Sequence, residues 1–251
     1  MDSTVTPETP VFHYEQRQRE NDLVALEVFD PARHAAQFVD QILKHPEVFA
    51  YTSFPPVGSA DGFLTQVYNP LASSLDDCLY AIRNKIGPGR NNADSRLAGV
   101  LSFNYTSKSE AVTELGVVVF PAFPRTHIAA NAIGLALVFA LDPPSQGGLG
   151  LRRVAWQANA RNEPSRRIAL RMGFEFEGVQ RWQRTFAPDR ACQEGNGESA
   201  AALAARNGTR PSDEAQGRHT AVYSVVWDEW DAKRPEVLAQ MVLRKSCQMG
   251  P

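Results

Sequence analysis

The sequence predicts a mixed α/β domain, in which helices pack on a central sheet. The first observation is the order of its segments, because β-rich runs alternate with stretches of helical pattern along most of the 251 residues. The second is one long segment that is apolar on nearly every face, as a helix packed on a sheet should be. The third is composition: 43% hydrophobic and 22% charged residues are ordinary values for a folded globular protein.

The chain opens its first strand–helix unit after a polar stretch. Leu23–Phe29 predicts a short strand. Asp30 and Pro31 then favour a helix start, with Asp as the N-cap and Pro at the first helical position. This helix is expected to end near His45, just before a proline. Residues 52–70 are rich in Pro, Gly and Ser and are predicted to form a loop with room for one helical turn.

Three β-rich runs and the apolar helix follow. A turn is expected at Ser107–Glu110, between the second and third runs. The helix is predicted from about Thr126 to Leu141 and should lie in the core. The three predicted strands are Cys78–Arg83, Arg96–Tyr105 and Val112–Phe120.

A second strand–helix–strand unit begins at Leu151–Ala158, which predicts a strand. Asn162–Met172 has an amphipathic pattern, and Gly173 occupies the C-cap position that ends such a helix. Phe174–Phe186 predicts the next strand, with a bulge at Gly178.

The last third of the chain changes in character. Residues 187–219 are mostly Gly, Ala, Ser, Asn and charged residues, which predicts a solvated excursion with at most one helical turn around Ala200–Arg206. Thr220–Trp227 returns to a strand pattern, and a final helix is expected at Pro235–Lys245. Trp227 and Trp230 are interpreted as packing residues.

The expected organisation is a single domain over residues 23–230. The insertion at 187–219 lies within it and is expected to be dispensable for folding. Residues 1–22 are expected to be a flexible lead-in, and 231–251 a C-terminal helix and tail.

Composition argues against several classes of function. A net charge of −2 gives no support to nucleic-acid binding, which requires a concentration of Lys and Arg. The longest apolar stretch, Ala132–Leu141, is too short to cross a bilayer, and the first residues do not have the pattern of a secretory signal. Cys78, Cys192 and Cys247 are far apart and have no His at metal-ligand spacing, so no metal site is expected. A cytoplasmic location is the expectation.

The most informative segment is RVAWQANARNEPSRRIALRMGFEFEGVQRWQR, residues 153–184. It closely resembles the second half of the GNAT acyltransferase domain, in which a strand ends in an Asn-rich turn before an Asn-x-x-Ser helix with an apolar-Gly-Phe exit. The continuation Glu177-Gly178-Val179 is similar to the ribosomal-protein and antibiotic acetyltransferase branch. The residues that carry the resemblance are Asn159, Asn162, Ser165, Met172, Gly173, Phe174 and Arg181.

The preceding half resembles the family as well. Glu114–Val119 is similar to the family's central strand, and Phe123–Asn131 lies where the family places its pyrophosphate loop. The usual loop has Gln or Arg, two residues, Gly, one residue, and Gly or Ala. Here His127 or Ile128 replaces the first Gly, depending on whether Pro124 or Arg125 is aligned first, so the sequence departs from the pattern.

The resemblance implies a mixed, mostly antiparallel sheet, acetyl-CoA as cosubstrate and no metal. Backbone N–H groups at a helix N-terminus form an anion site for the CoA pyrophosphate, helped by the helix dipole. Arg125 adds a charge-assisted contact. The implied cofactor-binding residues are Val117, Val118, Val119, Arg125, Thr126, His127, Ile128, Ala129, Ala130, Asn131, Asn162 and Ser165.

The implied reaction is transfer of an acetyl group to a primary amine of a protein, peptide or small molecule by direct attack. Many members use a Tyr four residues before the helix-ending Gly as the acid, and that position is Ala169 here. Ser165 is therefore the candidate acid, and Glu114 the candidate base. The acceptor and the choice between a monomer and a homodimer stay open.

Each of these features has a purely structural alternative. Asn162 and Ser165 are also an ordinary N-cap and its partner, His127 is equally a helix-start residue, and Glu114 a solvated carboxylate. A catalytically silent acyl-CoA-binding module and an interaction protein with the same fold remain as alternatives to the enzyme.

Overall fold

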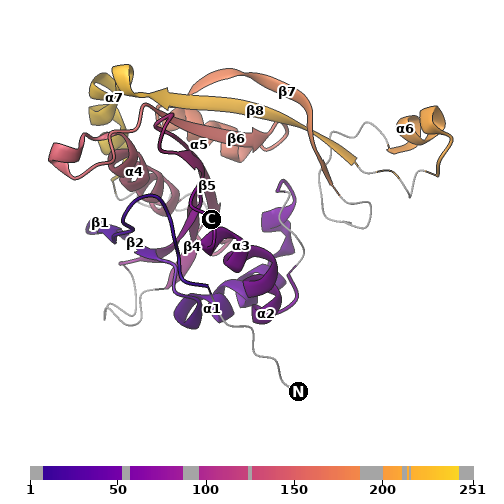
Figure 1. Cartoon of the computed structure of the whole chain (residues 1–251), viewed down its shortest axis with the longest axis horizontal. Helices are drawn as coiled ribbons and strands as arrows, with labels where there is room; N and C mark the ends of the chain where they lie inside the picture. The colour runs from indigo at the N-terminus through magenta and orange to yellow at the C-terminus, as the bar shows by residue number, and fades with distance from the viewer. Residues whose placement is uncertain are drawn as a thin grey trace, which may run out of the picture.

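A computed structural model describes residues 8–52, 57–86, 96–123, 126–186, 200–210, 214 and 216–242. Its centre is an eight-stranded sheet in the order β1-β2-β3-β4-β5-β6-β8-β7 (Figure 1). Neighbouring strands are antiparallel except β5 and β6, which are parallel. The predicted mixed and mostly antiparallel sheet is confirmed. The strands are β1 (Arg19–Glu20), β2 (Val24–Val28), β3 (Cys78–Asn84), β4 (Leu97–Ser107), β5 (Val112–Val119), β6 (Arg153–Asn159), β7 (Glu175–Phe186) and β8 (Gln216–Val226).

Helices cover both faces of the sheet. Figure 1 shows α1, α2 and α3 together on one side of β4 and β5, and α4 with α7 on the other. The α-helices are α1 (Pro31–Lys44), α2 (Ala60–Phe63), α3 (Asn69–Ala72), α4 (Ile128–Leu141), α5 (Glu163–Arg171), α6 (Ala200–Asn207) and α7 (Trp227–Gln240). Two 3₁₀ turns, η1 (Pro46–Phe49) and η3 (Pro144–Gln146), and one π-helical turn, η2 (Leu64–Tyr68), complete the described elements.

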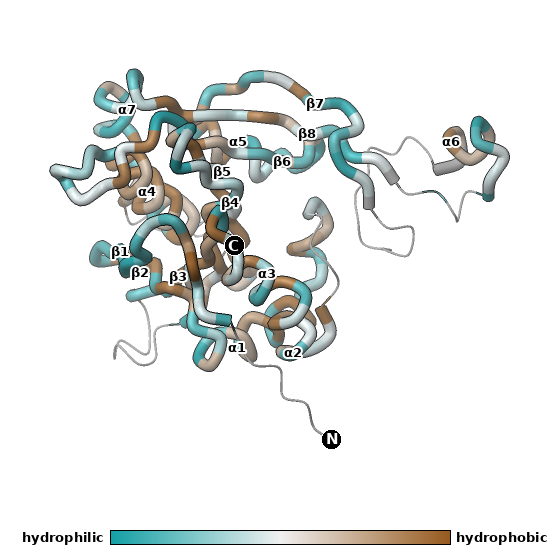
Figure 2. Tube along the Cα trace, viewed as in Figure 1, coloured by the Kyte–Doolittle hydropathy of each residue, from teal (hydrophilic) through white to brown (hydrophobic). Residues whose placement is uncertain are grey.

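The core has two parts, one on each face of the sheet. Strand β3 shows how the sequence builds both, because alternate side chains of a strand point to opposite faces. Tyr80 and Ile82 pack in the core beneath α4, while Leu79 and Ala81 pack beneath α1 and η2. Helix α4 is coloured predominantly brown in Figure 2, and most of its residues are buried, as its apolar sequence predicts.

Short-range capping signals place α1 and α5 where the sequence predicts them. The carboxylate of Asp30 accepts a hydrogen bond from Ala32 N at 3.0 Å, and α1 ends at Lys44. The Asn162 side chain caps α5, and Gly173 follows its end with φ +85°, a conformation that favours glycine. The predicted bulge at Gly178 is confirmed by a register shift between Phe176 and Gly178.

The prediction of a loop over residues 52–70 is wrong for its second half. Residues 60–72 form a continuous helical stretch through α2, η2 and α3. The side-chain oxygen of Ser59 caps it, accepting from Gly62 N at 3.0 Å. Phe63, Val67 and Tyr68 bury apolar surface beneath it, so tertiary packing overrides the helix-weakening Gly and Pro.

Part of the expected lead-in contacts the domain. Strand β1 pairs with β2, and the backbone N–H groups of Val11 and His13 donate to the carbonyls of Ala72 and Leu75, both at 3.0 Å. Backbone pairing, which composition does not reveal, therefore extends the ordered chain back from Leu23.

Three boundaries near the C-terminus also differ from expectation. α6 has eight residues, more than the single turn expected, and β8 begins at Gln216 rather than Thr220. Helix α7 starts at Trp227 and contains Pro235, so the expected start at that proline is wrong. Glu229 fixes the earlier start, because its carboxylate accepts from Val226 N at 3.0 Å.

The buried carboxylate of Asp142 joins the end of α4 to the interior of α7. It accepts from Trp230 Nε1 at 2.7 Å and from two nitrogens of Arg234, each at 2.9 Å. The interpretation of Trp230 as a packing residue is confirmed, since it is 2% exposed, whereas Trp227 is 60% exposed and belongs to the surface.

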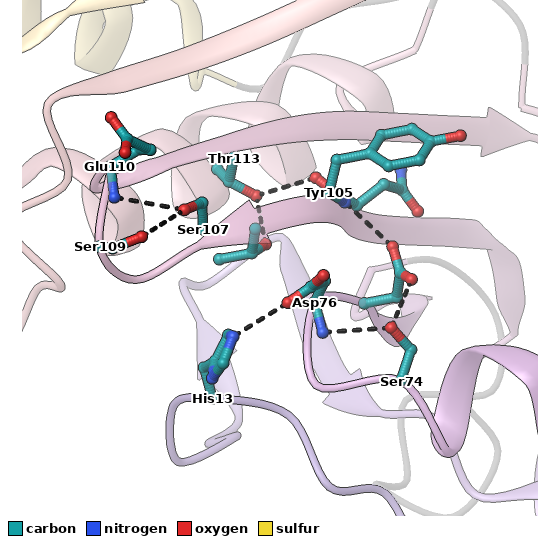
Figure 3. Close-up of polar contacts among 11 residues, drawn as sticks. His13, Ser74, Asp76, Tyr105, Ser107, Ser109, Glu110 and Thr113 are labelled. Atoms are coloured by element: carbon teal, nitrogen blue, oxygen red, sulfur yellow. Dashed lines mark hydrogen bonds and ion pairs between the residues drawn. The ribbon is translucent and has the colours of Figure 1, made fainter.

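The hairpin between β4 and β5 is fixed by the polar contacts drawn in Figure 3. Thr113 Oγ1 lies 2.7 Å from Thr106 Oγ1 in the interior, and Glu110 N donates to Ser107 Oγ at 3.2 Å. Tyr105 has φ +50° and donates its backbone N–H to an Asp77 carboxylate oxygen at 3.0 Å. This irregularity leaves the Tyr105 ring exposed at the rim of the cleft described next.

Candidate active site

The two parallel strands separate halfway along their length. β5 pairs with β6 only through four residue pairs, from Val112 with Arg153 to Leu115 with Trp156. Phe120 N bonds to Ala98 O at 2.9 Å, which fixes the side to which each backbone group of β5 points. Because that direction alternates along a strand, Val118 faces β4 while Val117 and Val119 face the gap. Their N–H and C=O groups have no partner strand there.

A cleft of about 410 Å³ lies at this separation. Val117 and Val118 of β5 line it, while Val119 does not. Side chains from the α1–α3 side form one wall: Tyr51, Thr52, Gln66, Val67, Pro70 and Leu71. The other wall comes from β6, β7, β8 and the start of α5: Trp156, Gln157, Asn159, Ser165, Arg184 and Arg218.

The carboxylate of Glu114 belongs to this cleft. It forms no hydrogen bond or ion pair with any residue that the structure describes. Burial raises its pKa above the usual range, because desolvation disfavours the charged form, and the positive charges of Arg184 and Arg218 oppose that shift. A carboxylate with a raised pKa and a free lone pair suits proton abstraction near neutral pH.

Ser165 and Asn162 are brought together at the start of α5, and both line the cleft. Asn162 Oδ1 accepts from Ser165 N at 3.1 Å, so the predicted cap is present. The Ser165 hydroxyl oxygen accepts from the indole Nε1 of Trp156, also at 3.1 Å. That contact occupies the oxygen as an acceptor and leaves the hydroxyl proton to be donated into the cleft.

The start of α4 contains most of the other predicted cofactor residues. His127 Nε2 lies 3.1 Å from Asn84 Oδ1, and burial lowers the pKa of this imidazole. Asn131 is fully buried and donates to His127 O, while its own oxygen accepts from Asn21. The side chains of His127 and Asn131 are therefore engaged in contacts within the protein.

Among the backbone N–H groups at the start of α4, Ile128 N donates to Thr126 Oγ1 at 3.3 Å. The N–H groups of Ala129 and Ala130 donate to no described residue, as expected in the first turn of a helix. They remain for an anion at the helix N-terminus. Arg125 lies outside the described residues.

Sequence reasoning missed the two arginines of the cleft. Arg184 and Arg218 stand directly opposite each other across β7 and β8, although 187–219 was predicted to be a solvated excursion. Arg218 is 6% exposed and donates from Nη1 to Tyr51 O at 3.3 Å. No alternation of apolar and polar residues marks Arg218 in the sequence; it is strand pairing that includes it in β8, which begins at Gln216.

Neither a metal centre nor a membrane span is found among the described residues. No cluster of three His, Cys, Asp or Glu residues is arranged to hold a metal ion among them. No helix within the described ranges has the length and apolarity needed to cross a membrane.

Comparisons with known proteins identify relatives of this chain in sequence and in fold. The family model "Acetyltransferase (GNAT) domain" matches residues 24–175. The uncharacterized N-acetyltransferase YoaA of Bacillus subtilis (strain 168) is 29% identical over 104 residues, covering 41% of this chain and 56% of YoaA. The chain thus spans little more than half the length of this curated relative.

Two solved structures show the same fold. A GCN5-related N-acetyltransferase from Brucella melitensis has a TM-score of 0.69 and 23% identity, over 93% of this chain and 89% of its own. The microcin C7 self-immunity acetyltransferase MccE, solved with acetyl-CoA and AMP, has a TM-score of 0.58 and 18% identity, over 82% of this chain and 93% of its own.

Proposed function

Because this chain belongs to the GNAT acetyltransferase family, we propose that it transfers an acetyl group from acetyl-CoA to a primary amine by direct attack. The observation that carries this proposal is the cleft at the separation of β5 and β6. There, a carboxylate, a hydroxyl with a free proton and unpaired strand backbone line one cavity. Acetyl-CoA supplies the activated acetyl group as a thioester.

The binding site for acetyl-CoA runs from the start of α4 to the gap. The N–H groups of Ala129 and Ala130 bind the pyrophosphate, and the positive end of the α4 dipole favours its charge. The backbone of Val117 and Val119 binds the pantetheine arm as a neighbouring strand would.

Val117 also polarises the thioester. Its N–H group faces the gap, so it is oriented to donate to the carbonyl oxygen, on which negative charge develops during attack. A backbone donor held in a sheet needs no reorganisation at that moment.

Glu114 and Ser165 move the protons. Glu114 accepts a proton from the attacking amine, and its raised pKa keeps it a sufficiently strong base. Ser165 donates its hydroxyl proton to the departing thiolate, because Trp156 holds the oxygen and leaves the proton available. The acid is thus supplied by α5, since Ala169 occupies the position of the family's Tyr.

The test of activity is release of the CoA thiol from acetyl-CoA in the presence of amines, peptides and polyamines. Acetylation of at least one amine, identified by mass spectrometry, supports the proposal. Binding of CoA without transfer to any amine would instead favour the catalytically silent acyl-CoA-binding module.

The test of the binding site is Ala129→Pro, which removes one N–H group at a helical position that tolerates proline. Calorimetry should show CoA affinity reduced about 10-fold, as for loss of one hydrogen bond to a charged group. Ala129→Val keeps the N–H and serves as the matched control. Equal affinity of the two folded variants would place the pyrophosphate elsewhere.

A further inference from the structure

The described residues that line the cleft carry more positive than negative charge. Arg184, Arg218 and Glu114 are its charged lining residues within the described part of the chain, so cations outnumber carboxylates there. The whole chain has the opposite balance, with a net charge of −2. A local positive excess inside a negatively charged protein attracts anions into the cleft.

The two arginines bring like charges close together in the sheet. They form a directly opposed cross-strand pair, and like charges in that position repel each other. Arg218 is also buried, and its Nε has no hydrogen-bond partner. Burial and the charge of Arg184 lower the pKa of Arg218 to about 10. A buried cation that the protein satisfies only in part indicates a site for a ligand.

An irregularity in β7 produces this pairing. The register of β7 against β8 shifts between Gln180 and Arg184, and Trp182 within the shift has φ +55°. The Trp182 N–H donates to His219 Nδ1 at 2.9 Å, and Gln183 Oε1 accepts from Thr220 Oγ1 at 2.7 Å. Bulges commonly re-aim side chains beside active sites, and this one sets Arg184 opposite Arg218.

We propose that the acceptor is a small primary amine that carries an oxyanion, a carboxylate or a phosphate, which Arg184 and Arg218 bind while Glu114 faces the nitrogen. This inference rests on the proposed function and names the substrate class of the same site. Guanidinium groups bind both oxyanions through paired N–H donors, so the shared chemistry is an oxyanion a few bonds from the amine. Polyamines are disfavoured, since their additional positive charges face two arginines.

The test compares matched acceptors with the wild-type protein and saturating acetyl-CoA. The pairs are β-alanine with propylamine and O-phosphoethanolamine with ethanolamine, and spermidine is the cationic comparison. With rates corrected for the fraction of neutral amine, kcat/KM should be at least about 10-fold higher for the anionic member of one pair. That pair identifies the oxyanion. Equal or better use of the neutral members, or of spermidine, would overturn the proposal.

Variants assign the preference to the arginines. Arg218→Gln should reduce the anionic-to-neutral ratio of kcat/KM about 10- to 100-fold, because the loss of a positive charge beside Glu114 affects both amines alike while the loss of the anion's partner affects the anionic amine alone. Arg152→Gln, at an exposed arginine outside the cleft, should leave the ratio unchanged. Arg184→Gln replaces Arg218→Gln if the latter has no cooperative melt. If both amines slow equally in these variants, the anionic-to-neutral ratio of kcat/KM stays constant. That result would contradict a role of the arginines in binding the anion.

A separate readout covers failure of the proposed function itself. If no amine is acetylated, the melting temperature of the CoA-loaded protein is measured with β-alanine or O-phosphoethanolamine and with their neutral partners. An anionic ligand should stabilise the wild type but not Arg218→Gln. The same melting temperature with and without the anionic ligands would then reject the oxyanion site.

Discussion

Replacing Ser165 with Ala separates its possible roles as an acid and as a structural residue. The Ser165 hydroxyl accepts a hydrogen bond from the indole N–H of Trp156, a residue that is 4% exposed. Loss of the hydroxyl therefore leaves this buried N–H donor without a partner. Such a loss costs about 1–3 kcal/mol. The Asn162 cap adds nothing to this figure, because it accepts from the backbone N–H of Ser165, which alanine retains.

For a protein of this size, each kcal/mol lowers the melting temperature by about 2–4 °C, so Ser165→Ala should melt about 2–12 °C lower. If the hydroxyl also protonates the thiolate, kcat should fall about 10²-fold or more. The KM for acetyl-CoA should change little, because the proton is needed only in the transition state. Calorimetry and thiol-release kinetics measure the two effects independently.

Two further variants control this experiment. Ser165→Thr keeps a hydroxyl and should recover most of the turnover. Thr106→Val removes a buried hydrogen bond to Thr113 outside the cleft, so it should lower the melting temperature but leave kcat unchanged. Full turnover of Ser165→Ala would refute the acid role and leave Ser165 as a support for Trp156, with water protonating the thiolate.

Three more predictions follow from pKa shifts and packing. The kcat/KM should fall as the pH drops through the raised pKa of Glu114, and Glu114→Gln should be slow and lack this acidic limb. Burial lowers the pKa of both His34 and His127, so in acid the unfolded chain binds more protons than the folded protein. Their contribution to stability should therefore be complete above about pH 6.5 and be lost as the pH falls through their pKa values in the folded protein. Melting temperatures measured from pH 5 to pH 8 test this. A methyl group on Gly217 would lie 1.9 Å from the Trp182 ring, so Gly217→Ala should lower the free energy of unfolding by about 1–3 kcal/mol in denaturant titrations. In a Trp182→Ala background, where the ring is absent, Gly217→Ala should cost much less.

Helices whose ends carry capping residues could be predicted from the sequence. Asp30 with Pro31, and Asn162 with Gly173, mark helix ends by capping chemistry that acts within a few residues. The start of α7 was placed wrongly, because a proline such as Pro235 is typical of the first turn of a helix. The helix in fact begins at Trp227, where the carboxylate of Glu229 accepts from Val226 N. The helical stretch 60–72 was missed because its stability comes from burial against the sheet.

The residues of the candidate site also fall into two groups, those that a local sequence pattern indicates and those that only the tertiary structure brings together. Glu114 was chosen from the strand segment 114–119, and Asn162 and Ser165 were chosen from the segment 153–184; all three line one cleft. Arg184 and Arg218 are separated by a low-complexity stretch, and only strand pairing across it sets them opposite each other. The hydrogen-bond partners of the His127 and Asn131 side chains likewise include Asn84 and Asn21, distant residues that no local pattern identifies.

The four-pair junction between β5 and β6 makes the sheet two panels joined by a short seam. One panel is β1 to β5 and the other is β6, β8 and β7. A ligand arm lying along the open part of the seam would take the position of a missing strand and tie the panels together. Without ligand, the amides of Val117 and Val119 should exchange with deuterium faster than those of Leu115 and Val118, and bound CoA should slow them. Acyl-donor binding would then stiffen the whole molecule, including the panel that carries both arginines, before the acceptor arrives.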